Sequence, residues 1–137
     1  MTLFPSPLQK GDHIGVIAPS SKWDVAKVQD AIKIIEARGY HVEMHAQTSL
    51  SHNQFAGTAQ QKVNALDEMF GNPDIKAIFC LVGGNGALHI LDQINYDTIK
   101  ENPKIILGNS DITAILNAIS SKTELVTING TTLTKMD

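Results

Sequence analysis

Short apolar runs alternate along this chain with longer segments whose apolar residues recur every three or four positions. The runs that predict strands are residues 13–18, 40–45, 77–82, 104–107 and 125–128. The segments that predict helices are residues 24–38, 58–69, 87–92 and 112–119. Strands that are apolar on both faces and alternate with helices are typical of parallel sheets. The pattern therefore predicts an α/β fold, with a mostly parallel sheet covered by helices on both faces.

Two helix ends carry local signals of their own. Gly39 stands directly after the periodic segment 24–38, where glycine commonly ends a helix. Thr58 is followed three residues later by Gln61, and this spacing predicts a capping box at the start of the next helix.

Composition and charge narrow the class of protein. The chain has 137 residues, 42% hydrophobic and 18% charged, which favours one folded domain and excludes disorder through charge excess. Eleven basic and fourteen acidic residues give a net charge of −3, so we expect no nucleic-acid partner and no polybasic membrane anchor. A single cysteine, no signal peptide and no long apolar run predict a cytoplasmic protein.

Three polar or glycine-rich segments follow predicted strands. They are the Pro-Ser-Ser loop (residues 19–21), the glycine loop (residues 83–86, Gly-Gly-Asn-Gly) and the serine turn (residues 108–111, Gly-Asn-Ser-Asp). In parallel α/β sheets, ligands bind outside the carboxyl ends of the strands. We therefore expect any chemistry in these three segments.

Ser110 has two interpretations. A sharp strand-to-helix turn exposes a serine hydroxyl beside outward-pointing backbone N–H groups, as in a nucleophile elbow, and Gly108 would give strand and helix room to approach. The elbow pattern Gly-x-Ser-x-Gly is only half met, because Ile112 stands at the second glycine position. In the other interpretation Ser110 or Asp111 is simply the N-cap of the next helix, which is the more common outcome for such a local pattern.

The glycine loop also has two interpretations. It fails as a dinucleotide fingerprint, because His89 occupies the third glycine position, and it lacks the lysine and hydroxyl residue of a P-loop. We therefore expect no cofactor. A bare N–H of this loop could stabilise a developing oxyanion. The alternative is a tight turn where two backbones pass closely.

Two further groups of residues have an ordinary explanation. His41, Glu43 and His45 alternate along a predicted strand and share one face, as metal ligands would. A solvated polar face on an edge strand is the more common outcome, and we expect no metal site. Cys80 lies mid-strand between apolar neighbours, which favours a small core residue over a nucleophile.

Eight short motifs occur here in the order found in the LD-carboxypeptidase family of serine peptidases, which includes the microcin C immunity peptidases. They are residues 11–12 (Gly-Asp), 14–20 (Ile-Gly-Val-Ile-Ala-Pro-Ser), 55–58 (Phe-Ala-Gly-Thr), 83–87 (Gly-Gly-Asn-Gly-Ala), 96–97 (Tyr-Asp), 102–104 (Asn-Pro-Lys), 108–111 (Gly-Asn-Ser-Asp) and 122–123 (Lys-Thr). Each motif is weak alone, but together they cover nearly the whole chain. The chain therefore resembles the family's amino-terminal domain, which implies a flavodoxin-like three-layer fold.

The resemblance also implies a site and a reaction. Ser110 corresponds to the nucleophile of a Ser-His-Glu triad, and the N–H groups of Asp111 and Gly84 are expected to form the oxyanion hole. The family's histidine and glutamate belong to a carboxy-terminal domain. Residues 1–137 are thus expected to be a nucleophile-bearing domain without a base, inactive alone and part of a homodimer when full-length. The family reaction releases D-alanine from murein tetrapeptide in the cytoplasm, during peptidoglycan recycling.

Three departures from the family pattern leave the substrate open. Asn109 replaces the tyrosine that usually precedes the serine. Val82 stands where the carboxypeptidase branch often has arginine and the microcin branch often has an apolar residue. Asn129 and Thr131 replace the histidine and proline of a usual His-Gly-Pro. The alternatives to a murein peptidase are an immunity-type peptidase acting on peptidyl-nucleotide antibiotics and a non-catalytic small-molecule binding module.

Overall fold

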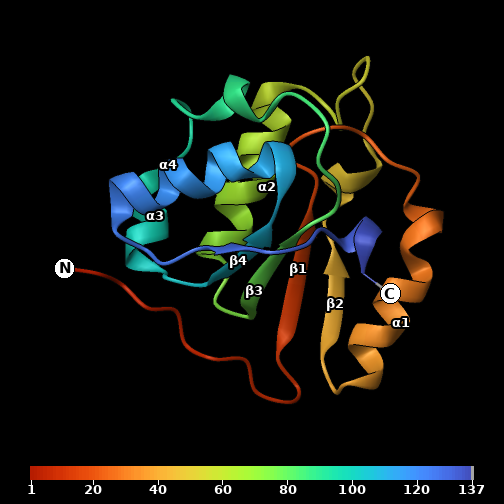
Figure 1. The fold of residues 1–137 in the computed structure, drawn as a ribbon, viewed down its shortest axis with the longest axis horizontal. Helices are drawn as coiled ribbons and strands as arrows, with labels where there is room; N and C mark the ends of the chain where they lie inside the picture. The colour runs from red at the N-terminus through yellow and green to blue at the C-terminus, as the bar shows by residue number, and fades with distance from the viewer. Residues whose placement is uncertain (137) are drawn as a thin grey trace.

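The computed structural model of this protein describes residues 1–136, and its central element is a five-stranded sheet (Figure 1). The strands are β1 (His13–Ile17), β2 (His41–Met44), β3 (Ile75–Cys80), β4 (Ile105–Gly108) and β5 (Ile128–Asn129). They lie in the order β2-β1-β3-β4-β5, and every neighbouring pair is parallel. This is the flavodoxin-like strand order. The predicted fold class is confirmed.

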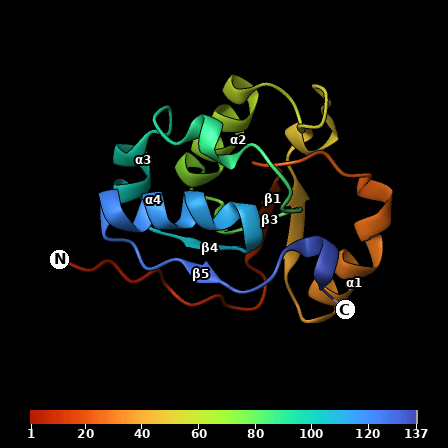
Figure 2. The same cartoon turned by 45° about the horizontal axis from the view of Figure 1, so that its top comes forward.

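Helices cover both faces of the sheet. The α-helices are α1 (Gln29–Ala37), α2 (Ala59–Gly71), α3 (Tyr96–Glu101) and α4 (Thr113–Thr123). Short 3₁₀ helices are η1 (Val25–Val28), η2 (Ala46–Ser49), η3 (Ala87–Ile90), η4 (Ser110–Ile112) and η5 (Leu133–Lys135). Figure 2 shows α2, α3 and α4 together on one face of the sheet, and α1 with η5 on the other.

Each face of the sheet has its own apolar core. Beneath α2, α3 and α4, buried side chains such as Phe70 and Ile115 pack against Ile78 and Ile106 of the sheet. On the opposite face, Ile35 of α1 belongs to a second cluster of buried side chains. Because both faces are covered, the strands are apolar on both sides, as the sequence pattern predicted.

The predicted helix signals are confirmed. Gly39 follows α1 with a φ of +98°, a conformation that glycine adopts without strain. Thr58 and Gln61 form both hydrogen bonds of the capping box, at 3.3 and 2.9 Å.

At the other end of α2, the buried Lys104 ammonium donates to the Met69 carbonyl at 2.8 Å. Burial, and the charge of Lys76, lower the pKa of Lys104 to about 8.

Several predicted boundaries are wrong, each for a different physical reason. Residues 125–128 do not form a fifth strand of that length, because Leu3 pairs with this segment: Val126 N–H donates to Leu3 C=O at 2.9 Å. Residues 24–28 are not α-helical, since the Asp24 carboxylate caps Ala26 and begins η1. Residues 87–92 contain only η3, and α3 was not predicted because a six-residue helix carries too little periodicity.

Within residues 1–136, no helix has the length and apolar character needed to cross a lipid bilayer.

Candidate active site

Three loops meet where β1, β3 and β4 end. Because β1 pairs with β3 and β3 with β4, all parallel, the Pro-Ser-Ser loop, the glycine loop and the serine turn leave the sheet at one edge. The prediction that the third and fourth predicted strands are neighbours is confirmed. Hydrogen bonds and close contacts between the loops, described below, show that they pack directly against one another.

The backbone of Ser110 is strained. Ser110 follows β4 and begins η4 with a φ of +56°, in the left-handed region that residues with a Cβ rarely adopt. Such a conformation costs about 1–3 kcal/mol and persists only where the surrounding structure holds it. The side chain is exposed, and its hydroxyl donates to no residue among 1–136. The predicted strain at Ser110 is confirmed, and its exposed hydroxyl has no hydrogen-bond partner within residues 1–136.

The interpretation of Ser110 or Asp111 as a plain N-cap is wrong. Asn109 occupies the cap position of η4, and no side chain caps either η4 or α4. The Asp111 carboxylate bonds to a different segment of the chain, as described below. The local pattern of a polar residue before a helix is misleading here, because the Asp111 carboxylate bonds to distant segments and the Ser110 hydroxyl bonds to no described residue.

Gly108 allows β4 and η4 to approach, as predicted. A Cβ built on Gly108 would lie 2.5 Å from Cγ2 of Ile112, closer than real side chains pack. Between these residues, Asn109 has an extended backbone, and its side-chain Oδ1 is buried without a hydrogen-bond partner among the described residues. An unpaired buried carbonyl costs about 1–3 kcal/mol, so the turn carries a second unfavourable feature beside Ser110.

The glycine loop lies directly against the serine turn. A Cβ on Gly83 would lie 3.2 Å from Cβ and 3.4 Å from Oγ of Ser110, and 3.7 Å from the backbone nitrogen of Asp111. Gly84 has a φ of +109°, and a Cβ there would lie 2.0 Å from Oγ of Ser21. A side chain at Gly84 would therefore collide with Ser21, whereas one at Gly83 would be tightly packed against Ser110. The oxyanion roles of the Gly84 and Asp111 N–H groups stay predictions.

The Asp111 carboxylate joins all three loops. Its Oδ2 accepts from the backbone N–H of Ala87 at 3.0 Å and from the buried Ser20 hydroxyl. The same hydroxyl bonds to the Asn85 carbonyl, and the Asn85 N–H donates to Ser21 Oγ, both at 2.9 Å. This network fixes the glycine loop relative to Ser110.

Two residues of this region were missed by residue-by-residue reasoning. Ser20 lies in the Pro-Ser-Ser loop, where chemistry is expected, but nothing local indicates that its hydroxyl donates to a carboxylate of a distant segment. Lys62 had a usable signal, because it lies four residues before Leu66 on the buried face of α2, where a lysine is unexpected. Both residues lie among the loops that carry the site.

A sequence profile described as the LD-carboxypeptidase N-terminal domain matches residues 14–130 of this chain. The match includes all three loops of the site. The chain belongs to the LD-carboxypeptidase family.

Named relatives fall into two groups. The chain is 38% identical over 126 residues to a probable murein peptide carboxypeptidase of Bacillus subtilis, covering 92% of this chain and 40% of the relative. It is 32% identical to the microcin C7 self-immunity protein MccF of Escherichia coli, covering 96% of this chain and 39% of that protein. The solved structure of an MccF-like protein from Bacillus anthracis superimposes with a TM-score of 0.93 at 34% identity, over 98% of this chain and 42% of that one. The chain thus spans about two fifths of the length of its LD-carboxypeptidase relatives.

No histidine of the described chain bonds to Ser110. His13 and His41 stack at the amino ends of β1 and β2, with ring centres 4.8 Å apart. His45 pairs with Glu68 at 2.6 Å. His89, the histidine that follows the glycine loop, packs edge-on against Phe55 instead.

The remaining candidates have structural environments. Cys80 is fully buried, and burial raises the pKa of its thiol to about 12, so its interpretation as a core residue is confirmed. His41 and Glu43 lie exposed on β2, which is an edge strand as expected. Within residues 1–136, no three histidine, cysteine or acidic side chains come together as metal ligands would.

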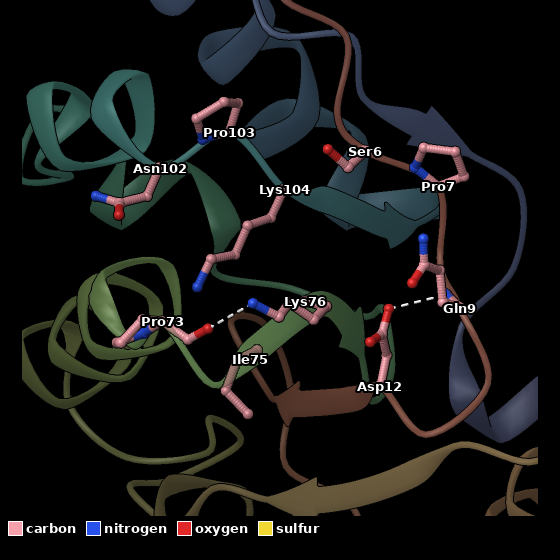
Figure 3. Close-up of a pocket in the computed structure, with 10 residues that line it drawn as sticks. All are labelled: Ser6, Pro7, Gln9, Asp12, Pro73, Ile75, Lys76, Asn102, Pro103 and Lys104. Atoms are coloured by element: carbon pink, nitrogen blue, oxygen red, sulfur yellow. Dashed lines mark hydrogen bonds between the residues drawn. The ribbon is translucent and has the colours of Figure 1, made fainter.

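A cavity of about 400 Å³ lies far from these loops, at the amino ends of β1, β3 and β4 (Figure 3). Its lining includes Asp12, Lys76 and Lys104, and the Lys76 ammonium donates to the Pro73 carbonyl at 2.9 Å. Ligands of parallel α/β sheets bind at the carboxyl ends of the strands, so this cavity is on the wrong side for the site.

Proposed function

We propose that residues 1–137 form the amino-terminal, nucleophile-bearing domain of a cytoplasmic serine LD-carboxypeptidase that is a homodimer when full-length. Its substrate is murein tetrapeptide, from which it releases the terminal D-alanine during peptidoglycan recycling. One observation carries the proposal: Ser110 is exposed, strained and unbonded, beside Gly83 and the backbone nitrogen of Asp111. A serine that served only to cap a helix would need none of these features.

In the proposed mechanism, the Ser110 oxygen attacks the carbonyl carbon of the L–D amide. The hydroxyl proton passes to a histidine, and the N–H groups of Asp111 and Gly84 stabilise the oxyanion. Collapse of the intermediate breaks the C–N bond, and D-alanine leaves with that proton on its nitrogen. Water then hydrolyses the acyl-enzyme. The histidine and its glutamate partner come from a carboxy-terminal domain.

Two relatives support a murein peptide or a related small peptide as the substrate. The Bacillus subtilis relative is named a probable murein peptide carboxypeptidase, and the Escherichia coli relative a self-immunity protein against microcin C7. One residue favours the second, immunity-type function: the half-buried Val82 precedes the glycine loop where the carboxypeptidase branch often has arginine. A missing arginine removes one cation that could select an anionic substrate.

The deciding experiment measures D-alanine release from murein tetrapeptide by a protein in which this chain is joined to a family carboxy-terminal domain. We expect turnover that Ser110→Ala lowers by several powers of ten, because the members of a triad act as a unit. Ser121→Ala, an exposed serine of α4, is the matched control and should retain full turnover.

The same protein offered a peptidyl-nucleotide separates the alternatives. Hydrolysis of this substrate alone would support the immunity function over murein recycling. Binding of either ligand without turnover, equal in the Ser110→Ala variant, would favour the non-catalytic module. Retained D-alanine release in Ser110→Ala would remove Ser110 from the mechanism.

A further inference from the structure

Lys62 is a buried cation on the core-facing side of α2. The residue is only 2% exposed, although lysine is almost never buried to this degree without a charged partner. Its Nζ lies 4.5 Å from the centre of the Phe55 ring, and within residues 1–136 it makes no hydrogen bond and no ion pair. Burial lowers the pKa of Lys62, and the charge of Asp111 raises it. The ammonium therefore lacks the hydrogen bonds and the close ion pair that usually compensate a buried charge.

The Lys62 ammonium is accessible from a small cavity. Asn109 Oδ1 is the one side-chain polar atom of residues 1–136 that is both fully buried and unpaired, so the unpaired Lys62 Nζ must retain some accessible surface. Lys62 lines a cavity of about 210 Å³ together with His52, Phe55 and His89. None of the residues lining this cavity is acidic. A positive charge and no negative one favour an anionic ligand.

The size and charge of the cavity favour a carboxylate. Its volume of about 210 Å³ is below the range of roughly 300–1,000 Å³ typical for drug-sized ligands, so only a small group fits. Lys62 supplies one positive charge, and Asp111 lies close enough to offset part of it, although its Oδ2 accepts from Ser20 and Ala87. A single positive charge matches a monoanionic carboxylate better than a phosphate dianion.

The glycine loop connects this cavity to Ser110. A Cβ on Gly86 would lie 2.9 Å from Lys62 Nζ, and a Cβ on Gly83 would lie 3.2 Å from Cβ of Ser110. Three peptide units separate these two glycines, so their Cα atoms are at most about 11 Å apart. A peptide of three or four residues spans that distance when extended.

We propose that Lys62 and its cavity bind a carboxylate group of a small peptide, positioning the peptide along the glycine loop. The assignment of this peptide as the substrate rests on the proposed function, whereas the carboxylate site itself does not. The cavity explains why a lysine without hydrogen bonds remains at a buried position of α2. A substrate carboxylate supplies the missing acceptor, with Phe55 beside it as an apolar wall.

The test is a titration of the isolated chain, followed through its backbone amide signals by NMR. The ligands are N-acetyl-D-alanine, with a terminal carboxylate, and N-acetyl-glutamic acid α-amide, with a side-chain carboxylate. N-acetyl-D-alaninamide is the neutral control, and inorganic phosphate is the competing anion. We expect saturable shifts at Thr58, Gly86 and His89 with at least one carboxylate, and none with the neutral amide.

Variants of Lys62 establish which cation binds. Lys62→Met should weaken carboxylate binding by about tenfold or more, because the buried charge is lost. It should be at least as stable as wild type, since an apolar side chain replaces an unpaired buried charge. Lys62→Arg keeps the charge and should retain part of the binding. Lys33→Met, at an exposed lysine of α1, is the matched control and should leave binding unchanged.

Other outcomes contradict the proposal. Equal shifts with the neutral amide, tighter binding of phosphate, or unchanged binding in Lys62→Met would each overturn it. If Lys62→Met fails to fold, the positions of the shifted amides in the wild-type chain provide the test. Shifts confined to amides near the surface lysines would overturn the proposal. The ligand that binds more tightly identifies the carboxylate source. The titration measures binding and not hydrolysis. If the protein proved not to be a peptidase, the carboxylate binding at Lys62 would still stand.

Discussion

Ser110 keeps a strained backbone because the residues on both sides of it are fixed. On one side, Gly108 packs against Ile112, where a Cβ would approach Cγ2 to 2.5 Å. On the other, the Asp111 carboxylate is held by the Ala87 N–H at 3.0 Å. Because both neighbours are fixed, few backbone conformations are open to Ser110. Packing elsewhere offsets the cost of its φ of +56°.

Substitution at Ser110 should reveal this strain directly. A left-handed conformation costs a residue with a Cβ about 1–2 kcal/mol, whereas glycine loses about 0.5–1 kcal/mol through backbone entropy. We therefore expect Ser110→Gly to be more stable than Ser110→Ala by roughly 0.5–1 kcal/mol in urea unfolding. At Ser121, inside α4, the order should reverse by about 1 kcal/mol. If the glycine and alanine variants had the same order of stability at both positions, the backbone of Ser110 would not be strained.

Cys80 should be inert in the folded protein. Burial raises the pKa of its thiol to about 12, so the reactive thiolate is scarce at any pH below that value, and the sulfur is also inaccessible. Iodoacetamide at pH 8 should label Cys80 only after unfolding in denaturant, as measured by intact mass. Rapid labelling of the native chain would show that β3 opens readily.

At the scale of elements, one carboxylate holds three loops together. Asp111 lies in η4, just before α4, whereas Ser20 follows β1 and Ala87 begins η3. Hydrogen bonds to a charged group are stronger than neutral ones, at about 1.5–3 kcal/mol each. The serine turn and the glycine loop are therefore expected to loosen together if this carboxylate is lost.

Asp111→Ala should lower the free energy of unfolding by about 2–3 kcal/mol and speed hydrogen exchange at the Ala87 amide. A double-mutant cycle with Ser20→Ala should give a coupling of roughly 1 kcal/mol, because the two side chains share a hydrogen bond. The exposed Asp97 of α3 is the control, and its alanine variant should cost less than about 1 kcal/mol. If the effects of Asp111→Ala and Ser20→Ala on the free energy of unfolding simply add, the two side chains are not coupled and this prediction is wrong.

Two glycines of secondary-structure elements should respond oppositely to alanine. Gly108→Ala places a methyl group 2.5 Å from Ile112 Cγ2 and should destabilise the protein by about 1–3 kcal/mol. Gly71, the last residue of α2, has Thr98 Cγ2 at 3.7 Å as the nearest neighbour of an added Cβ. Gly71→Ala should therefore stabilise by about 0.5–1 kcal/mol. Chemical denaturation of both variants measures the contrast.

At the scale of the whole molecule, the described chain provides a candidate nucleophile and its loops but no base. Each of its histidines lies elsewhere, stacked at the amino ends of the strands, paired with Glu68, or lining the cavity beside Lys62. A serine hydroxyl without a base is a weak nucleophile at neutral pH. We therefore expect catalysis to require the histidine that the proposed mechanism takes from a carboxy-terminal domain.

The isolated chain should consequently show no release of D-alanine from murein tetrapeptide above the rate in buffer. Measurement by a coupled D-amino-acid assay is sensitive enough to detect slow turnover. His89→Ala is the informative variant, because His89 follows the glycine loop. Turnover by the isolated chain that disappeared in His89→Ala would show that this chain contains its own base.

The alternation of apolar runs and periodic segments predicted much of the fold. Strands β1 to β4 and helices α1, α2 and α4 all fall within or beside their predicted segments. The error at residues 125–128 occurs because a distant residue decides the pairing. Leu3 takes the backbone bonds of Val126, so the last strand is only Ile128–Asn129. No pattern within residues 125–128 could reveal that competition.

Local periodicity and turn chemistry were enough to predict the α/β class, the helix caps at Gly39 and Thr58, and the three loops that carry the site. How those loops contact one another depends on the folded chain. The strain at Ser110, the clamp from Asp111 to Ser20 and the buried Lys62 each depend on contacts between segments far apart in the chain. Local pattern favoured a helix cap at the serine turn, but long-range hydrogen bonds and packing instead left a strained, free hydroxyl.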